Sequence, residues 1–178
     1  MSLSLLASAL LLGTLQGNRS RQDDFDDIYA SHKWGTTLSG PGSTLDGSTN
    51  ARNMILATMG RLCKLQPHGS CHLQMLDAAC GDMTWMPLVL EQAMREGIAV
   101  SYTGADVSEV VLRINRANTA LQSRLESATR SHDFIHLDLA VDSLPQTYDL
   151  VVARHVLMHL SNAEITSVLR GIRRSSSR

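Results

Sequence analysis

The sequence is poor in several residue types, and each shortage excludes a class of protein. Of its 178 residues only 12 are glycine and 4 are proline, which excludes collagen-like and low-complexity chains. The three cysteines are an odd number and do not make a disulfide scaffold. Aromatic residues make up 4% of the chain, so the core must be built mainly from aliphatic side chains and methionine.

The sequence also has no marked excess of positive or negative charge. The chain has 16 basic and 17 acidic residues, a net charge of −1, and no long basic run. A large nucleic-acid footprint needs such a run, so no nucleic-acid partner is expected. With 43% hydrophobic residues, the composition instead fits one globular domain rather than a disordered chain.

Residues 1–17 form an apolar N-terminal segment, in which Leu3 to Leu15 are a strongly apolar run. The apolar run is shorter than the ~20 residues of a transmembrane helix, but it has the length of a signal-peptide hydrophobic region. No Lys or Arg precedes it. The segment is therefore either a secretory signal or anchor, or an amphipathic or buried leading helix, and the sequence leaves both interpretations open. The protein is expected in the cytoplasm or, if the segment is a signal or anchor, in the secretory pathway or on a membrane.

Residues 18–50 are predicted to be a polar linker followed by a loop rich in glycine and serine. A helix is expected from Ser48 or Thr49, because apolar residues recur at helical spacing as far as Leu62. Cys63 and Cys71 flank the Pro/Gly stretch that ends this helix, and the sequence does not establish whether they pair.

From Leu73 onward, strand patterns alternate with helix patterns. The strands are expected at Leu73–Ala79, Ala99–Val107, Asp133–Leu139 and Tyr148–Arg154. The helices are expected at Trp85–Glu96, from a Ser108 cap in one piece to Leu125, and after Ser161. This alternation predicts an α/β fold with a parallel sheet and helices on both faces. Ligands of such sheets bind beyond the carboxyl ends of the strands.

Three acidic residues lie at or near those strand ends. Asp77 closes the first strand, and Gly81 in the next turn lets the backbone approach a ligand closely. Asp106 ends the second strand, where a carboxylate can hold both hydroxyls of a ribose. Asp138 belongs to the third predicted strand and is placed to meet the polar edge of a base.

Four segments in this order resemble the class I S-adenosylmethionine-dependent methyltransferases. They are LDAACGD (76–82), YTGADVS (102–108), FIHLDLAVDSLP (134–145) and YDLVVARHVLMHL (148–160). The upstream segment YASHKWGTTLSGPGSTLDGS (29–48) resembles a subgroup in which a Trp and an SGxGST loop precede the core. The family turn is usually richer in glycine, and here Ala79 and Met83 occupy two of those positions.

The resemblance implies a Rossmann-like three-layer fold whose full sheet has seven strands. Only four are recognisable, so residues 51–178 are expected to be a methyltransferase-like domain that lacks the later strands and leaves its fourth strand as an open edge. The implied cofactor is S-adenosyl-L-methionine, and the methyl acceptor is unidentified. The implied cofactor-binding residues are Asp77, Ala79, Cys80, Gly81, Asp106, Val107, Asp138, Leu139 and Arg154. Arg154 and His155 are the candidates for catalysis.

Two other functions are open. A nicotinamide-dependent oxidoreductase needs G-x-G-x-x-G after the first strand, where this chain has only Gly81. A non-catalytic chain of methyltransferase shape would bind the cofactor weakly or not at all. His155 and His159 have the spacing of one helix face, but further zinc ligands are not nearby, so no metal is expected. Trp34 either closes over a substrate or anchors the core.

Overall fold

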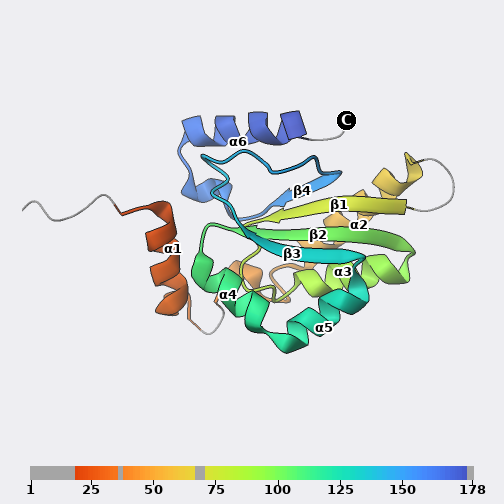
Figure 1. Cartoon of the computed structure of the whole chain (residues 1–178), viewed down its shortest axis with the longest axis horizontal. Helices are drawn as coiled ribbons and strands as arrows, with labels where there is room; N and C mark the ends of the chain where they lie inside the picture. The colour runs from red at the N-terminus through yellow and green to blue at the C-terminus, as the bar shows by residue number, and fades with distance from the viewer. Residues whose placement is uncertain (1–18, 36–37, 67–70, 176–178) are drawn as a thin grey trace, which may run out of the picture.

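The computed structural model describes residues 19–35, 38–66 and 71–175, which form a four-stranded sheet flanked by helices (Figure 1). The strands are β1 (Cys71–Ala78), β2 (Ile98–Asp106), β3 (Ser131–His136) and β4 (Leu150–Ala153), in the order β3-β2-β1-β4. All three neighbouring pairs are parallel. The predicted α/β fold is therefore confirmed, while the apolar N-terminal segment lies outside the described residues.

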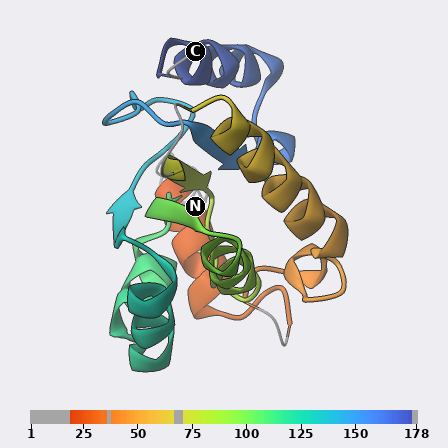
Figure 2. The same ribbon diagram turned by 90° about the vertical axis from the view of Figure 1, so that its right-hand side faces the viewer.

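Helices cover both faces of this sheet (Figures 1 and 2). The helices α2 (Thr49–Lys64), α3 (Met86–Arg95) and α5 (Thr119–Ala128) pack on one face, and α6 (Asn162–Ser175) packs on the other. Successive side chains of a strand point to opposite faces. Accordingly Met75 of β1 belongs to the core beside α2 and α3, and Leu76 belongs to the core beside α6. Among the helices that the structure describes, none is long and apolar enough to cross a membrane.

The prediction of an irregular linker is wrong over Arg21–Ala30, which form helix α1. The Ser20 hydroxyl accepts a hydrogen bond from the Asp23 backbone N–H, and the Asp23 carboxylate accepts one from the Ser20 backbone N–H. This reciprocal capping box satisfies two N–H groups at the start of the helix. The helix is polar along most of its length, so hydrophobic periodicity does not reveal it.

The prediction of a single helix after Ser108 is also wrong. The structure has two helices there, α4 (Glu109–Ala117) and α5. Asn118 has an extended backbone conformation, and its side chain accepts a hydrogen bond from the Leu121 backbone N–H at 3.1 Å. Asparagine is a favourable N-cap, so this residue ends α4 and begins α5. Ser108 caps α4, as predicted.

The third strand lies earlier in the chain than predicted, at Ser131–His136 instead of Asp133–Leu139. Its register is fixed by pairing with Ser101–Asp106 of β2. Asp138 and Leu139 therefore follow the strand and lie at the carboxyl edge of the sheet. Short 3-10 helices, η1 (Pro41–Ser43) and η2 (Leu157–His159), contribute to the same edge.

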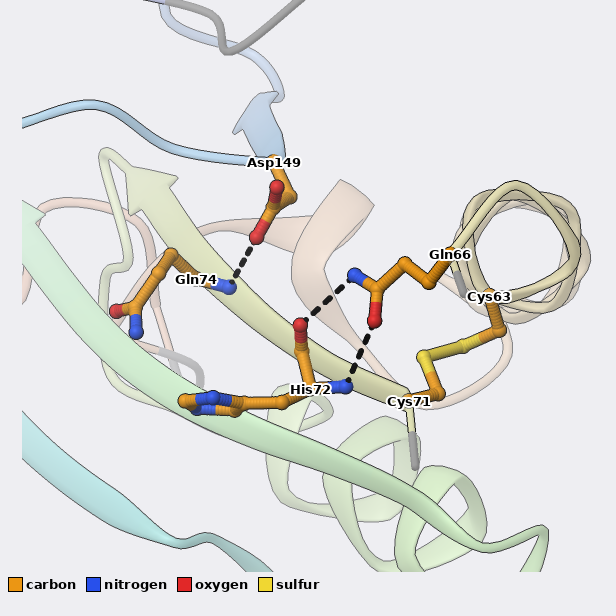
Figure 3. Close-up of a disulfide and its surroundings, with 6 residues drawn as sticks. All are labelled: Cys63, Gln66, Cys71, His72, Gln74 and Asp149. Atoms are coloured by element: carbon orange, nitrogen blue, oxygen red, sulfur yellow. Dashed lines mark hydrogen bonds between the residues drawn. A yellow bond between two sulfur atoms is a disulfide. The ribbon is translucent and has the colours of Figure 1, made fainter. Parts of the chain in front are cut away.

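A disulfide between Cys63 and Cys71 joins the end of α2 to the start of β1 (Figure 3). Beside it, the Gln66 side chain donates to the His72 carbonyl at 2.9 Å and accepts from the His72 N–H at 3.1 Å. These contacts fasten the amino end of β1, at the opposite end of the strand from Asp77. The pairing that the sequence leaves open is thus present in the structure.

Candidate functional site

A cavity of about 360 Å³ lies at the carboxyl edge of the sheet. The segments that follow the four strands line it, together with α1 and the loop that contains η1. All of the residues predicted for the site line this one cavity: Asp77, Ala79, Cys80, Gly81, Asp106, Val107, Asp138, Leu139, Arg154 and His155. The topology thus brings together side chains that lie far apart in the sequence.

The turn after β1 has a backbone that favours glycine at alternate positions. Ala79, Gly81 and Met83 have φ angles of 66°, 59° and 58°. This left-handed conformation costs a non-glycine residue roughly 1–2 kcal/mol, which explains why a turn of this kind is usually glycine-rich. Met83 does not obstruct the cavity, because its side chain is buried in the core with Sδ 3.0 Å from the Tyr102 hydroxyl.

Asp106 is 3% exposed and organises the backbone around the cavity. Its Oδ2 accepts the Gly81 N–H and its Oδ1 accepts the Ser108 N–H, both at 3.0 Å. Burial raises the pKa of Asp106 to about 6, although these backbone N–H groups act in the opposite direction.

Asp77 is 2% exposed, and its Oδ2 accepts a hydrogen bond from the Tyr102 hydroxyl at 3.0 Å. Burial raises the pKa of Asp77 to about 7, while the Tyr102 hydrogen bond and the charge of Arg154 lower it. Both carboxylates thus change charge close to neutral pH. A ligand that donates hydrogen bonds or carries positive charge would stabilise their ionised forms.

Helix α1, which sequence reasoning missed, crosses the carboxyl ends of the strands (Figure 1). Arg21 donates from Nη1 to both oxygens of Asp138 at 2.6 Å, and its Nη2 pairs with Glu164 of α6. Farther along α1, Asp26 accepts from the Ser108 hydroxyl at 2.6 Å. The helix is therefore fastened on both sides of the cavity. The one sequence signal for it is the Ser20 capping box.

The loop before α2 is fastened over the ends of β1 and β4. Ser39 and Asp82 exchange two hydrogen bonds, at 2.7 and 3.2 Å. Arg154 donates from Nη2 to the carbonyl oxygens of Gly42 at 2.7 Å and Gly47 at 3.1 Å. The Arg154 guanidinium also lies over the Trp85 ring, 5.6 Å from its centroid. Arg154 lines the cavity and at the same time holds the loop that closes it.

The cavity wall beside β4 is aromatic. Phe25 packs edge-on against Trp34 and His159, with ring centroids 6.1 and 5.4 Å apart. Trp34 also packs against Tyr29, so it is both a wall of the cavity and a packing anchor.

His155 follows β4 with a φ of 57°, and a Cβ atom at Gly42 would collide with its ring. Burial and the charge of Arg154 lower the pKa of His155, which favours the neutral imidazole, the form that can accept a proton. Within the described parts of the chain, the structure holds no group of three His, Cys, Asp or Glu side chains that could bind a metal ion.

A parallel sheet with acidic residues at its carboxyl edge and a strand-to-helix turn in one cavity defines a Rossmann-like ligand-binding domain. The model of a family described as "Methyltransferase domain" matches residues 76–177, more than half of the chain. The chain therefore belongs to this family. No curated protein sequence matches the chain.

Solved methyltransferase structures share the fold. The glycopeptide N-methyltransferase MtfA complexed with sinefungin is 16% identical with a TM-score of 0.51, and the match covers 90% of this chain and 58% of MtfA. The DhpI–SAH complex is 15% identical with a TM-score of 0.50, and the match covers 88% and 62%. Phosphoethanolamine N-methyltransferase 1 of Haemonchus contortus is 16% identical with a TM-score of 0.51, and the match covers 90% and 32%. The chain thus spans less than two thirds of each of these proteins.

Proposed function

We propose that this chain binds S-adenosyl-L-methionine in the cavity and transfers its methyl group to an acceptor. The observation that carries the proposal is the meeting of Asp77, Asp106 and the Gly81 turn in one cavity at the carboxyl edge of a methyltransferase-family sheet. The neighbouring structures support it, since DhpI is described with SAH and MtfA with sinefungin.

The residues of the cavity fit this cofactor. The Asp106 carboxylate accepts hydrogen bonds from the backbone N–H groups of Gly81, Ser108 and Val107. A carboxylate has about four acceptor sites, so it can also accept a ribose hydroxyl. Asp77 offers a carboxylate to the cationic amino group. Val107, Leu137 and Leu139 supply apolar walls for the adenine base. The Asp138 carboxylate can accept a hydrogen bond from the exocyclic amine of the base if it binds this amine and Arg21 together.

The cofactor, when bound, supplies a methyl group that its sulfonium already activates. The chain's task is to hold the two reactants in line. In the proposal the acceptor lies beside His155 and the aromatic wall, and the neutral imidazole orients it or accepts its proton. Arg154 keeps the loop closed over both reactants.

The second candidate, a non-catalytic chain that binds the cofactor weakly or not at all, is favoured by the engagement of Arg154 and Asp138 with other parts of the chain. Mass spectrometry after incubation with labelled cofactor and fractions of native extract separates the two functions. A labelled acceptor supports the transferase, and weak or absent cofactor binding with no labelled acceptor supports the non-catalytic chain.

Isothermal titration calorimetry with S-adenosylhomocysteine tests the cofactor assignment itself. We expect binding to the wild-type chain and none to Asp106→Ala, because the variant loses charge-assisted hydrogen bonds to the ribose. Circular dichroism must show that the variant is folded, since Asp106 also holds the Gly81 and Ser108 backbones. Glu126→Ala, on the exposed side of α5, is the matched control. Unchanged affinity in folded Asp106→Ala would overturn the assignment.

For location, we infer an oxidising compartment. The Cys63–Cys71 disulfide supports this inference, because such bonds persist in secreted and lumenal proteins and are rare in reducing ones. Alkylation of the protein in unlysed cells, before any reduction, is the test. Protected Cys63 and Cys71 are the expected result, and labelled thiols at both positions would refute the inference.

A further inference from the structure

We propose that Tyr102 is a positioning residue that directs the Asp77 carboxylate at the amino-acid part of the bound cofactor. The inference rests on the cofactor assignment proposed above. Tyr102 does not line the cavity and is not among the nine residues that the sequence predicts for cofactor binding. It acts through Asp77, which does line the cavity.

The register of the sheet brings the two side chains together. Asp77 of β1 lies opposite Gly104 of β2, and Tyr102 precedes Gly104 by two residues on the same face. Tyr102 and Asp77 are thus diagonal neighbours across two strands, within reach of a long side chain. The hydroxyl lies 3.0 Å from Asp77 Oδ2, and each residue is 2% exposed.

The Tyr102 ring is held where it is by its surroundings. A Cβ atom at Gly104 would lie 2.8 Å from the Phe134 ring and 3.1 Å from the Tyr102 hydroxyl, so glycine leaves the space for both. The Tyr102 and Phe134 rings pack edge-on with centroids 6.4 Å apart, and Met83 Sδ lies 3.0 Å from the hydroxyl. A fixed hydroxyl fixes one oxygen of Asp77.

The same contact governs the charge of Asp77. The groups that act on it are Tyr102 and Asp106 from β2 and Arg154 after β4. The Cys80 thiol lies in the same turn, and burial, Asp106 and Asp77 raise the pKa of that thiol. Burial and Asp106 raise the pKa of Asp77, whereas the Tyr102 hydrogen bond and Arg154 lower it. Burial raises the pKa of Tyr102 well above its usual value, so the hydroxyl stays protonated and remains a donor. Without this donor the carboxyl would hold its proton to a higher pH and attract an ammonium group less.

The test compares two nucleosides in Tyr102→Phe, which removes the hydroxyl and keeps the ring. S-adenosylhomocysteine carries the amino-acid part, and 5′-methylthioadenosine lacks it. By calorimetry between pH 6 and 9, we expect the affinity for S-adenosylhomocysteine at pH 7 to fall about tenfold, the usual effect of losing a hydrogen bond to a charged group. The pH at which that affinity reaches its plateau should rise. The affinity for 5′-methylthioadenosine should not change.

Tyr148→Phe is the matched control, because it removes a buried hydroxyl that has no hydrogen-bond partner among the described residues. It should leave both affinities unchanged. An unaltered affinity and pH profile for S-adenosylhomocysteine in Tyr102→Phe would overturn the inference. Equal losses for both nucleosides would overturn it too, because they indicate a purely structural role. If the wild-type chain binds neither nucleoside, the cofactor assignment fails first and this inference fails with it.

Discussion

Asp77 and Asp106 combine near-complete burial with pKa values raised to about 7 and about 6, against an ordinary value of 3.8. The folded chain therefore holds more protons than the unfolded chain between pH 4 and the raised pKa values. Stability from this source is present at low pH and is lost as pH rises through both values. We expect the free energy of unfolding of the ligand-free protein, measured in urea, to fall from pH 5 to pH 8.

The control for this pH dependence is Asp77→Asn, which removes one titrating group but keeps an acceptor for the Tyr102 hydroxyl. The fall in stability with pH should become shallower in this variant. A free energy of unfolding that rises over the same interval, or an equal slope in the variant, would contradict the assignment of the shift to Asp77.

Single site residues are predictable from the sequence where they follow a strand. Asp77, Gly81, Asp106 and Arg154 all meet in the cavity because parallel strands end at one edge. The partners of these residues are not predictable in the same way. No local pattern indicates that Arg21 pairs with Asp138, which is 117 positions away, or that Arg154 binds the carbonyls of Gly42 and Gly47.

Among the elements, α1 is the one whose attachment is most open to test. The Arg21 side chain is 24% exposed and pairs with the carboxylates of Asp138 and Glu164. We expect Arg21→Gln to lower the free energy of unfolding by ~1–2 kcal/mol, between the values for exposed and buried ion pairs. Amide hydrogen exchange in α1 should become faster in the variant than in the wild-type chain, because the helix loses its attachment at one end. Exchange in α3 should change less.

Arg19→Gln is the comparison for this experiment. Arg19 forms ion pairs with Asp24 and Asp27, but its side chain is 56% exposed, so a change below about 0.5 kcal/mol is expected. The attachment model would be wrong if exchange in α1 had the same rate in Arg21→Gln and in the wild-type chain.

Elements with strong apolar patterns are predictable, and those set by polar capping are not. The pattern indicates β2, α3 and β4 to within a few residues. It misses α1, which begins at the Ser20–Asp23 capping box, and it misses the break at Asn118. In both places side-chain hydrogen bonds to the backbone outweigh hydrophobic periodicity.

For the molecule as a whole, the edges of the sheet matter most. Among the described residues β4 has one strand neighbour, β1, and the row Leu150–Ala153 lines a groove beside α2. The open edge that the sequence predicts at the fourth strand is therefore present among the described residues. The segments that line the cavity follow β1, β2, β3 and β4, so the cavity forms without a further strand beside β4.

The Cys63–Cys71 disulfide acts at the scale of the whole molecule, because it joins α2 to the first strand of the sheet. It closes a loop between residues 8 positions apart, and loop-closure entropy predicts a stabilisation of ~2–3 kcal/mol.

Reduction with dithiothreitol should therefore lower the free energy of unfolding by about that amount, as measured in urea. Affinity for S-adenosylhomocysteine should persist in the folded reduced protein, because Cys71 begins β1 and Asp77 lies at its other end, beside the cavity. The double variant Cys63→Ser/Cys71→Ser controls for effects of the reductant and should be equally stable with and without it. Unchanged stability on reduction of the wild-type chain would show that α2 and the sheet are held together by their apolar contacts alone.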